Sequence, residues 1–149
     1  MKQQSIQITR YWKTPPELYQ KLDQEFNFDF DPCPCPRPIG FNGLNIDWGK
    51  MNYVNPLFLL KDCDNKQSGP TAFVRKAIEE SKKGKSSFLT IPTQSYVNLL
   101  LEAGAGLRSL GRIKWLEVDT NEPMKGPSNI TGFYLKGINT TSLNKGNEK

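Results

Sequence analysis

The sequence predicts a single α/β domain with three layers and a mostly parallel sheet. Segments with strand-like and helix-like patterns alternate along the chain, and this order favours a sheet covered by helices on both faces. The chain has 149 residues, which is the length of one domain. In such folds ligands bind beyond the carboxyl ends of the strands. The residues that follow each expected strand are therefore the first candidates for a functional site.

The first expected helix follows a start signal at Thr14-Pro15. Thr14 can cap the helix, Pro15 fits the first helical position, and Glu17 completes a capping box. The helix is expected to end near residue 25, and its inward face carries apolar side chains at helical spacing: Leu18, Leu22 and Phe26. Residues 28–31 then alternate as a short strand. The prolines that follow require an extended loop: Pro32, Pro34, Pro36 and Pro38.

Later segments complete the alternation of strands and helices. Further strands are expected over residues 51–54, 87–91, 113–118 and 130–135, and further helices over 70–83 and from Thr93 or Ser95 to Leu101. We interpret residues 1–10 as a flexible lead-in, 11–136 as the domain and 137–149 as a flexible tail without a core face.

The composition limits the chemistry that the chain can perform. It contains no histidine, which excludes Ser-His and Cys-His nucleophilic catalysis and the usual near-neutral general base. Its three cysteines lack the partners of the common zinc sites, so we interpret them as free thiols and expect no metal. Any enzyme built from this chain needs a reaction that works without histidine or metal.

Charge and hydropathy indicate the kind of partner. The net charge of +5 suits a polyanion such as a nucleic acid, although many small proteins are equally basic. No apolar run approaches the roughly 20 residues that cross a membrane, and residues 1–9 have no signal-peptide core. We therefore expect a cytoplasmic protein that has no membrane partner.

Six short motifs follow one another along the chain. They are Trp12-Lys13-Thr14-Pro15-Pro16-Glu17-Leu18, Asp31-Pro32-Cys33, Asn42-Gly43-Leu44-Asn45-Ile46-Asp47-Trp48, Val54-Asn55-Pro56-Leu57-Phe58, Gly111-Arg112-Ile113-Lys114-Trp115 and Gly126-Pro127-Ser128. In this order they resemble the compact phage-type DNA N6-adenine methyltransferases, over about residues 11–136. The resemblance implies a reduced Rossmann-like methyltransferase fold, S-adenosylmethionine as cofactor and N6 of adenine in DNA as the methyl acceptor. It also suggests a virus or prophage gene, whose product would act in the host cytoplasm.

Methylation of an exocyclic amine requires the kinds of residue that follow the second expected strand. The N6 lone pair is delocalised into the adenine ring, so two hydrogen-bond acceptors are needed to stabilise the positive charge that develops on the nitrogen. The Asn55 side-chain oxygen and the Pro56 carbonyl can form that pair. Phe58 can stack on the base, which is worth about 1–3 kcal/mol elsewhere. Asn55, Pro56 and Phe58 are the predicted catalytic residues.

The resemblance also implies a set of cofactor-binding residues: Thr14, Pro15, Asp31, Pro32, Asn42 and Asn55. The chain departs from the family in two places, because Leu57 replaces the second proline of the motif and no glycine-rich loop follows the first strand. Only ten residues separate Asp31 from Asn42, so we expect a truncated sheet.

DNA contacts are expected from a group of basic residues near the end of the domain, and we select Arg108, Arg112 and Lys114 as phosphate ligands. We expect no separate target-recognition domain within these residues. Sequence selection then falls to short loops, to the second subunit of a homodimer, or is nearly absent. Two alternatives stay open: N4-cytosine methylation by the same acceptors, and an inert nucleic-acid-binding module of the same fold, which Leu57 favours.

Overall fold

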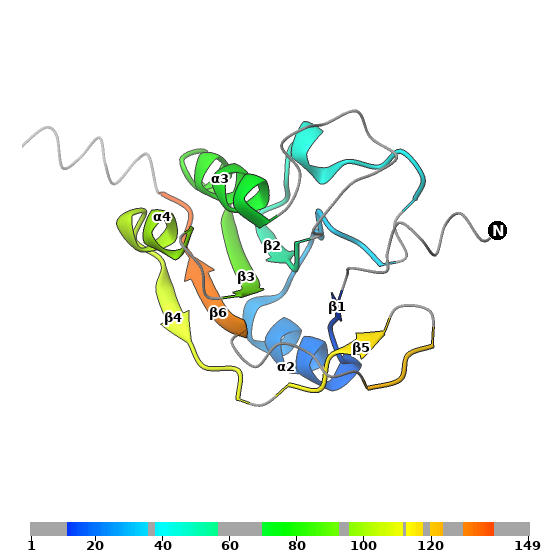
Figure 1. Cartoon of the computed structure of the whole chain (residues 1–149). Helices are drawn as coiled ribbons and strands as arrows, with labels where there is room; N and C mark the ends of the chain where they lie inside the picture. The colour runs from blue at the N-terminus through cyan, green and yellow to red at the C-terminus, as the bar shows by residue number, and fades with distance from the viewer. Residues whose placement is uncertain are drawn as a thin grey trace, which may run out of the picture.

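The computed structural model describes residues 12–35, 38–56, 70–92, 96–111, 113–117, 120–123 and 130–138. Its elements in chain order are β1 (Trp12–Lys13), α2 (Pro16–Phe26), the 3-10 helix η1 (Gly43–Asn45), β2 (Met51–Val54), α3 (Pro70–Ser81), β3 (Ser86–Pro92), α4 (Val97–Glu102), β4 (Gly106–Arg108), β5 (Leu116–Glu117) and β6 (Ile130–Leu135). Figure 1 shows α3 and α4 on one side of the central strands and α2 on the other. The α/β class expected from the sequence is confirmed.

The main sheet has four strands in the order β2-β3-β6-β4. β2 pairs with β3 in parallel, whereas β6 is antiparallel to both β3 and β4. Phe30 adds a single parallel bridge to Asn52 at the β2 edge. A separate two-stranded antiparallel ladder joins β1 to β5.

The expectation of a mostly parallel sheet is not confirmed, because two of the three strand pairings in the main sheet are antiparallel. The chain enters β6 at Ile130, which lies opposite Pro92 at the carboxyl end of β3. A parallel partner at that point would need a crossover to the opposite end of the sheet, usually through a helix. The described residues between β4 and β6 contain no helix. β2, β3 and β4 nevertheless all run in the same direction.

Two apolar clusters fill the space on either side of the sheet. Tyr53 and Phe88 pack with Leu22 of α2 on one face. Val54 and Leu89, the next residues along the same strands, belong to the larger cluster that includes α3 and α4 on the other face. This alternation along the strands places helices on both faces and gives three layers.

Several expected boundaries differ from the observed ones. Pro15 is the N-cap residue of α2 and no side chain caps that helix, so the predicted capping role of Thr14 is wrong. The expected strand over 28–31 is reduced to the Phe30 bridge, and that over 113–118 to β5. Gly137, assigned to the tail, donates its backbone N–H to the Ser86 hydroxyl at 2.8 Å. Residues 1–10 and 139–149 lie outside the described part of the chain.

Candidate active site

The residues predicted to share a site follow neighbouring strand ends. The Phe30 carbonyl accepts the Tyr53 backbone N–H at 3.0 Å, so the segment that ends in Asp31 runs beside β2. Asn55 follows the last residue of β2 and is 7% exposed. Both positions therefore lie at the carboxyl end of parallel backbone segments, where α/β folds bind ligands.

A chain of hydrogen bonds runs inward from Asn55. Its side-chain Nδ2 donates to the Thr14 hydroxyl at 3.1 Å. The Thr14 hydroxyl lies 2.6 Å from the Tyr53 hydroxyl, which in turn lies 3.2 Å from that of Thr90. Thr14 thus contacts the predicted catalytic side chain directly. This contact explains why Thr14 does not cap α2.

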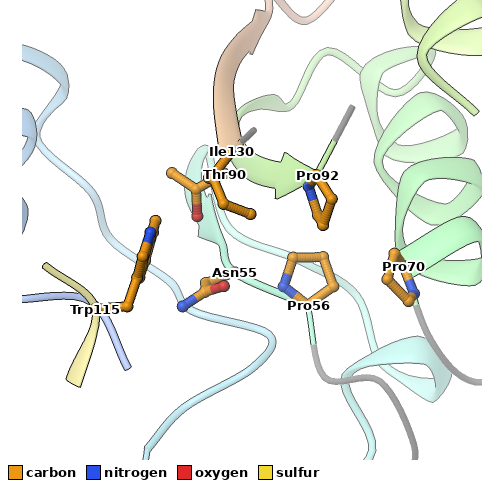
Figure 2. A pocket seen from close by; sticks show the side chains of 7 residues that line it. All are labelled: Asn55, Pro56, Pro70, Thr90, Pro92, Trp115 and Ile130. Carbon is orange, nitrogen blue, oxygen red and sulfur yellow. The ribbon is translucent and has the colours of Figure 1, made fainter. Parts of the chain in front are cut away.

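A small pocket opens beside Asn55, as Figure 2 shows. Its cavity volume is about 10 Å³, which is far below the usual range for small-molecule sites and is about enough for one water molecule. Its lining comes from the carboxyl ends of β2 and β3, the start of α3, the start of β6 and the segment before β5: Asn55, Pro56, Pro70, Thr90, Pro92, Trp115 and Ile130.

Trp115 forms an aromatic wall of this pocket. Its ring faces the pocket from one side in Figure 2, and the proline rings lie on the other. The side chain is 1% exposed, so its orientation is fixed by packing. Trp115 belongs to one of the six motifs, but no role was predicted for it. The local sequence pattern does not show that this residue reaches the end of β2.

Asp31 is a partly buried carboxylate whose charge is poorly stabilised by the protein. Burial raises its pKa to about 6, although the Cys33 backbone N–H donates to its Oδ1 atom at 2.8 Å and favours ionisation. Its charge also contributes to the raised pKa of the Tyr53 hydroxyl, for which burial is the main cause. No described basic side chain forms an ion pair with Asp31. A cationic ligand would supply the missing charge.

Pro32 and Asn42 are brought together by a close backbone approach. A Cβ atom built on Gly43 would lie 2.1 Å from the Pro32 carbonyl oxygen, so only glycine fits there. Asn42 is buried, and its Oδ1 atom accepts the Leu44 backbone N–H at 2.9 Å. Its Nδ2 atom is buried and has no hydrogen-bond partner among the residues that the structure describes. A buried donor of this kind costs free energy unless a ligand accepts from it.

Glu80 of α3 anchors the segment that carries Asn42. Its Oε1 atom accepts the Trp48 backbone N–H at 2.9 Å, and the Trp48 indole N–H donates to the Gly43 carbonyl at 2.7 Å. Burial raises the pKa of Glu80, but the Trp48 N–H and the neighbouring lysines outweigh it and lower the pKa to about 2. Three ammonium groups lie within 3.3 Å of this carboxylate: those of Lys76, Lys83 and Lys85.

The predicted DNA-binding residues do not form one patch in the described part of the chain. The Arg108 guanidinium binds both carboxylate oxygens of Glu25, with Nη1 at 2.5 Å from Oε1, and lies over the Phe26 ring. Its strand, β4, is at the edge of the sheet farthest from β2. Lys114 is exposed and directly precedes Trp115. Arg112 lies outside the described residues.

Of the other predicted site residues, some lie on a pocket or groove and others lie outside the described part of the chain. Pro56 lines the pocket with Asn55. Pro15 is the N-cap of α2 and lies on a groove with Leu18 and Lys114. Phe58 and Leu57 lie outside the described residues. Within the described ranges, no group of acidic, cysteine or histidine side chains could hold a metal ion.

No described helix has the length and apolar character needed to span a membrane.

Comparisons with protein-family models, curated proteins and solved structures found no match to this chain. The function is therefore inferred from the residues and their geometry.

Proposed function

We propose that this chain is an S-adenosylmethionine-dependent DNA methyltransferase that modifies N6 of adenine. The observation that carries the proposal is the position of Asn55-Pro56 at the carboxyl end of β2, on a pocket walled by Trp115. The direction shared by β2, β3 and β4 supports a reduced Rossmann-like methyltransferase sheet, into which β6 is inserted antiparallel.

Asn55 and Pro56 would supply the two acceptors that the reaction needs. The Asn55 amide nitrogen donates to the Thr14 hydroxyl. In Figure 2 the amide oxygen lies on the side of Pro56. Two acceptors on one side of a pocket can hold both N6 hydrogens and stabilise the positive charge that grows on the nitrogen. The N6 proton is afterwards released to water, so no histidine base is required.

Asp31, Pro32 and Asn42 would bind the cofactor. S-adenosylmethionine, when bound, supplies an electrophilic methyl group on a positively charged sulfur. Its cationic groups complement the Asp31 carboxylate, which has no ion-pair partner among the described residues. The unpaired Nδ2 donor of Asn42 suits an acceptor nitrogen of a purine ring. The donors and acceptors present therefore fit this cofactor.

Trp115 would hold the target base in place. The aromatic wall opposite proline rings would suit a planar base once the lining moves apart to admit it. Stacking of a base on an aromatic side chain contributes about 1–3 kcal/mol. A base in a duplex must first leave the stack, which costs a few kcal/mol. The pocket would recover part of that cost.

One experiment separates this proposal from its alternatives. The protein is incubated with methyl-labelled S-adenosylmethionine and mixed-sequence DNA, and the DNA is digested to nucleosides. We expect the label in N6-methyladenosine. Label in N4-methylcytidine would move the function to cytosine. The absence of label, together with no cofactor binding by calorimetry, would leave a nucleic-acid-binding module without activity.

A further inference from the structure

We propose that Thr14 and Tyr53 are positioning residues that set the orientation of the Asn55 amide. This inference rests on the proposed function, since it concerns how Asn55 presents its oxygen to the target amine. Thr14 was expected to bind the cofactor, and Tyr53 was given no role. The hydrogen bonds that link them to Asn55 indicate a different task.

An asparagine amide has two nearly equal orientations, because its last torsion is broad and two-fold. Only one orientation places Oδ1 toward the amine of a bound base. The other places the NH₂ group there, which cannot accept a hydrogen bond and opposes a growing positive charge. The rate of transfer therefore depends on what fixes the amide.

Thr14 fixes the orientation of the Asn55 amide through the single proton of its hydroxyl group. Its Oγ1 atom lies between Asn55 Nδ2 at 3.1 Å and the Tyr53 hydroxyl at 2.6 Å. If the Thr14 proton is donated to Tyr53, only lone pairs remain for Asn55. Thr14 can then accept from Nδ2 but cannot donate to Oδ1. The amide nitrogen is held inward and its oxygen is presented to the pocket.

Tyr53 keeps the Thr14 hydroxyl proton pointing toward its own hydroxyl oxygen. Its side chain is 2% exposed, and burial raises the pKa of its hydroxyl, which therefore stays protonated. Its own proton can be donated to Thr90, whose hydroxyl oxygen lies 3.2 Å away. Thr90 is 1% exposed and belongs to β3. The relay thus runs Asn55 to Thr14 to Tyr53 to Thr90, and it connects the site to the interior of the sheet.

The relay predicts a graded set of rate changes in single-turnover methylation. Thr14→Val removes the acceptor that Thr14 offers to Nδ2, so the amide orientation is less well defined and the rate falls about tenfold or more. Thr14→Ser keeps the hydroxyl and restores most of the rate. Tyr53→Phe frees the Thr14 proton for either orientation, so the rate falls about twofold to fivefold. The double variant Thr14→Val/Tyr53→Phe loses no more than Thr14→Val alone, because Tyr53 acts only through Thr14.

Two further readouts distinguish positioning from other roles. The Kd for S-adenosylmethionine should be unchanged in Thr14→Val, and thermal unfolding should confirm that each variant is folded. A raised Kd with an unchanged single-turnover rate would return Thr14 to the cofactor pocket and overturn the inference. Additive losses in the double variant would also overturn it.

The relay can be tested even if the protein transfers no methyl group. The Asn55 side-chain NH₂ gives two proton signals in a nitrogen-correlated NMR spectrum, and the hydrogen-bonded one should shift in Thr14→Val but not in Thr14→Ser. Shifted signals in a protein without activity would support the relay and refute the proposed function. Identical NH₂ signals in wild type and Thr14→Val would refute the relay, whatever the activity.

Discussion

Gly43 packs so closely on Pro32 that a Cβ atom at Gly43 would lie 2.1 Å from the Pro32 carbonyl oxygen. This approach joins two of the motifs in the sequence, the one after the first strand and the one that contains Asn42. It brings the Asn42 amide nitrogen, for which no described residue is a hydrogen-bond partner, and the Asp31 carboxylate to the same end of the fold. This contact therefore holds the proposed cofactor-binding residues together.

Replacing Gly43 by alanine should therefore damage both stability and cofactor binding. The new methyl group meets backbone atoms that cannot move independently, so we expect Gly43→Ala to destabilise the fold by about 1–3 kcal/mol in urea unfolding, as overpacking does in general. Gly106→Ala is the matched control, because nothing lies within 4 Å of its Cβ position. Equal unfolding midpoints for the two variants would contradict the close approach.

Asp31 should make stability depend on pH. Because its folded pKa is raised from 3.8 to about 6, the folded protein binds the proton more tightly than the unfolded chain. The contribution of Asp31 to stability is thus most favourable below about pH 4, falls as pH rises to about 6 and stays lower above that. Asp31→Asn removes this penalty and should stabilise the protein at pH 7.5 by up to about 3 kcal/mol, with little effect at pH 4. The same variant should bind S-adenosylmethionine much more weakly. A destabilised Asp31→Asn protein at pH 7.5 would refute this interpretation of the carboxylate.

Glu80 should be essential for the segment that carries Asn42. Glu80→Gln leaves three lysine ammonium groups without their shared carboxylate. Because these lysine side chains are 12–47% exposed, we expect a cost below the about 3–5 kcal/mol that is typical of breaking a fully buried ion pair. Glu79→Gln, on the exposed neighbouring position, is the control and should be nearly neutral. The lowered pKa of Glu80 means that its contribution is present above about pH 4.5 and is lost as pH falls toward about 2. Chemical unfolding at pH 7 and pH 3 tests both statements.

The two described basic candidates should affect DNA binding unequally. Arg108 is already paired with Glu25, whereas Lys114 is exposed near the pocket. Lys114→Gln should therefore reduce the slope of log K against log salt by about one, as expected for one phosphate contact. Arg108→Gln should change the slope less. A larger effect for Arg108→Gln would mean that DNA displaces Glu25 from the guanidinium.

The local patterns of the chain predicted some elements well. β2 and β6 have the expected bounds, because each is a short apolar run between clear breaks. β1 and β4 were missed, since two or three residues carry no periodic pattern and form strands only through pairing. The direction of β6 depends on where the chain re-enters the sheet, which no local pattern records.

The sequence motifs identified residues of the candidate site but did not predict the contacts between them. The motifs placed Asn55 and Pro56 correctly after β2, and both line the pocket. Thr14 was predicted to cap a helix because it precedes Pro15. Its hydrogen bond to Asn55 joins distant parts of the chain and could not be predicted from local sequence. Trp115 was missed as a pocket wall for the same reason. Contacts between distant segments decide the role of each of these residues.

The central claim is that Asn55 accepts a hydrogen bond from the target amine while the methyl group moves. The most direct test is single-turnover methylation of one DNA duplex by wild type and Asn55→Ala, with both proteins checked for folding and cofactor affinity. Losing one preorganised transition-state hydrogen bond costs about 10²–10³ in rate, so we expect that decrease with a nearly unchanged Kd for S-adenosylmethionine. An Asn55→Ala protein that methylates adenine at the wild-type rate would contradict the account.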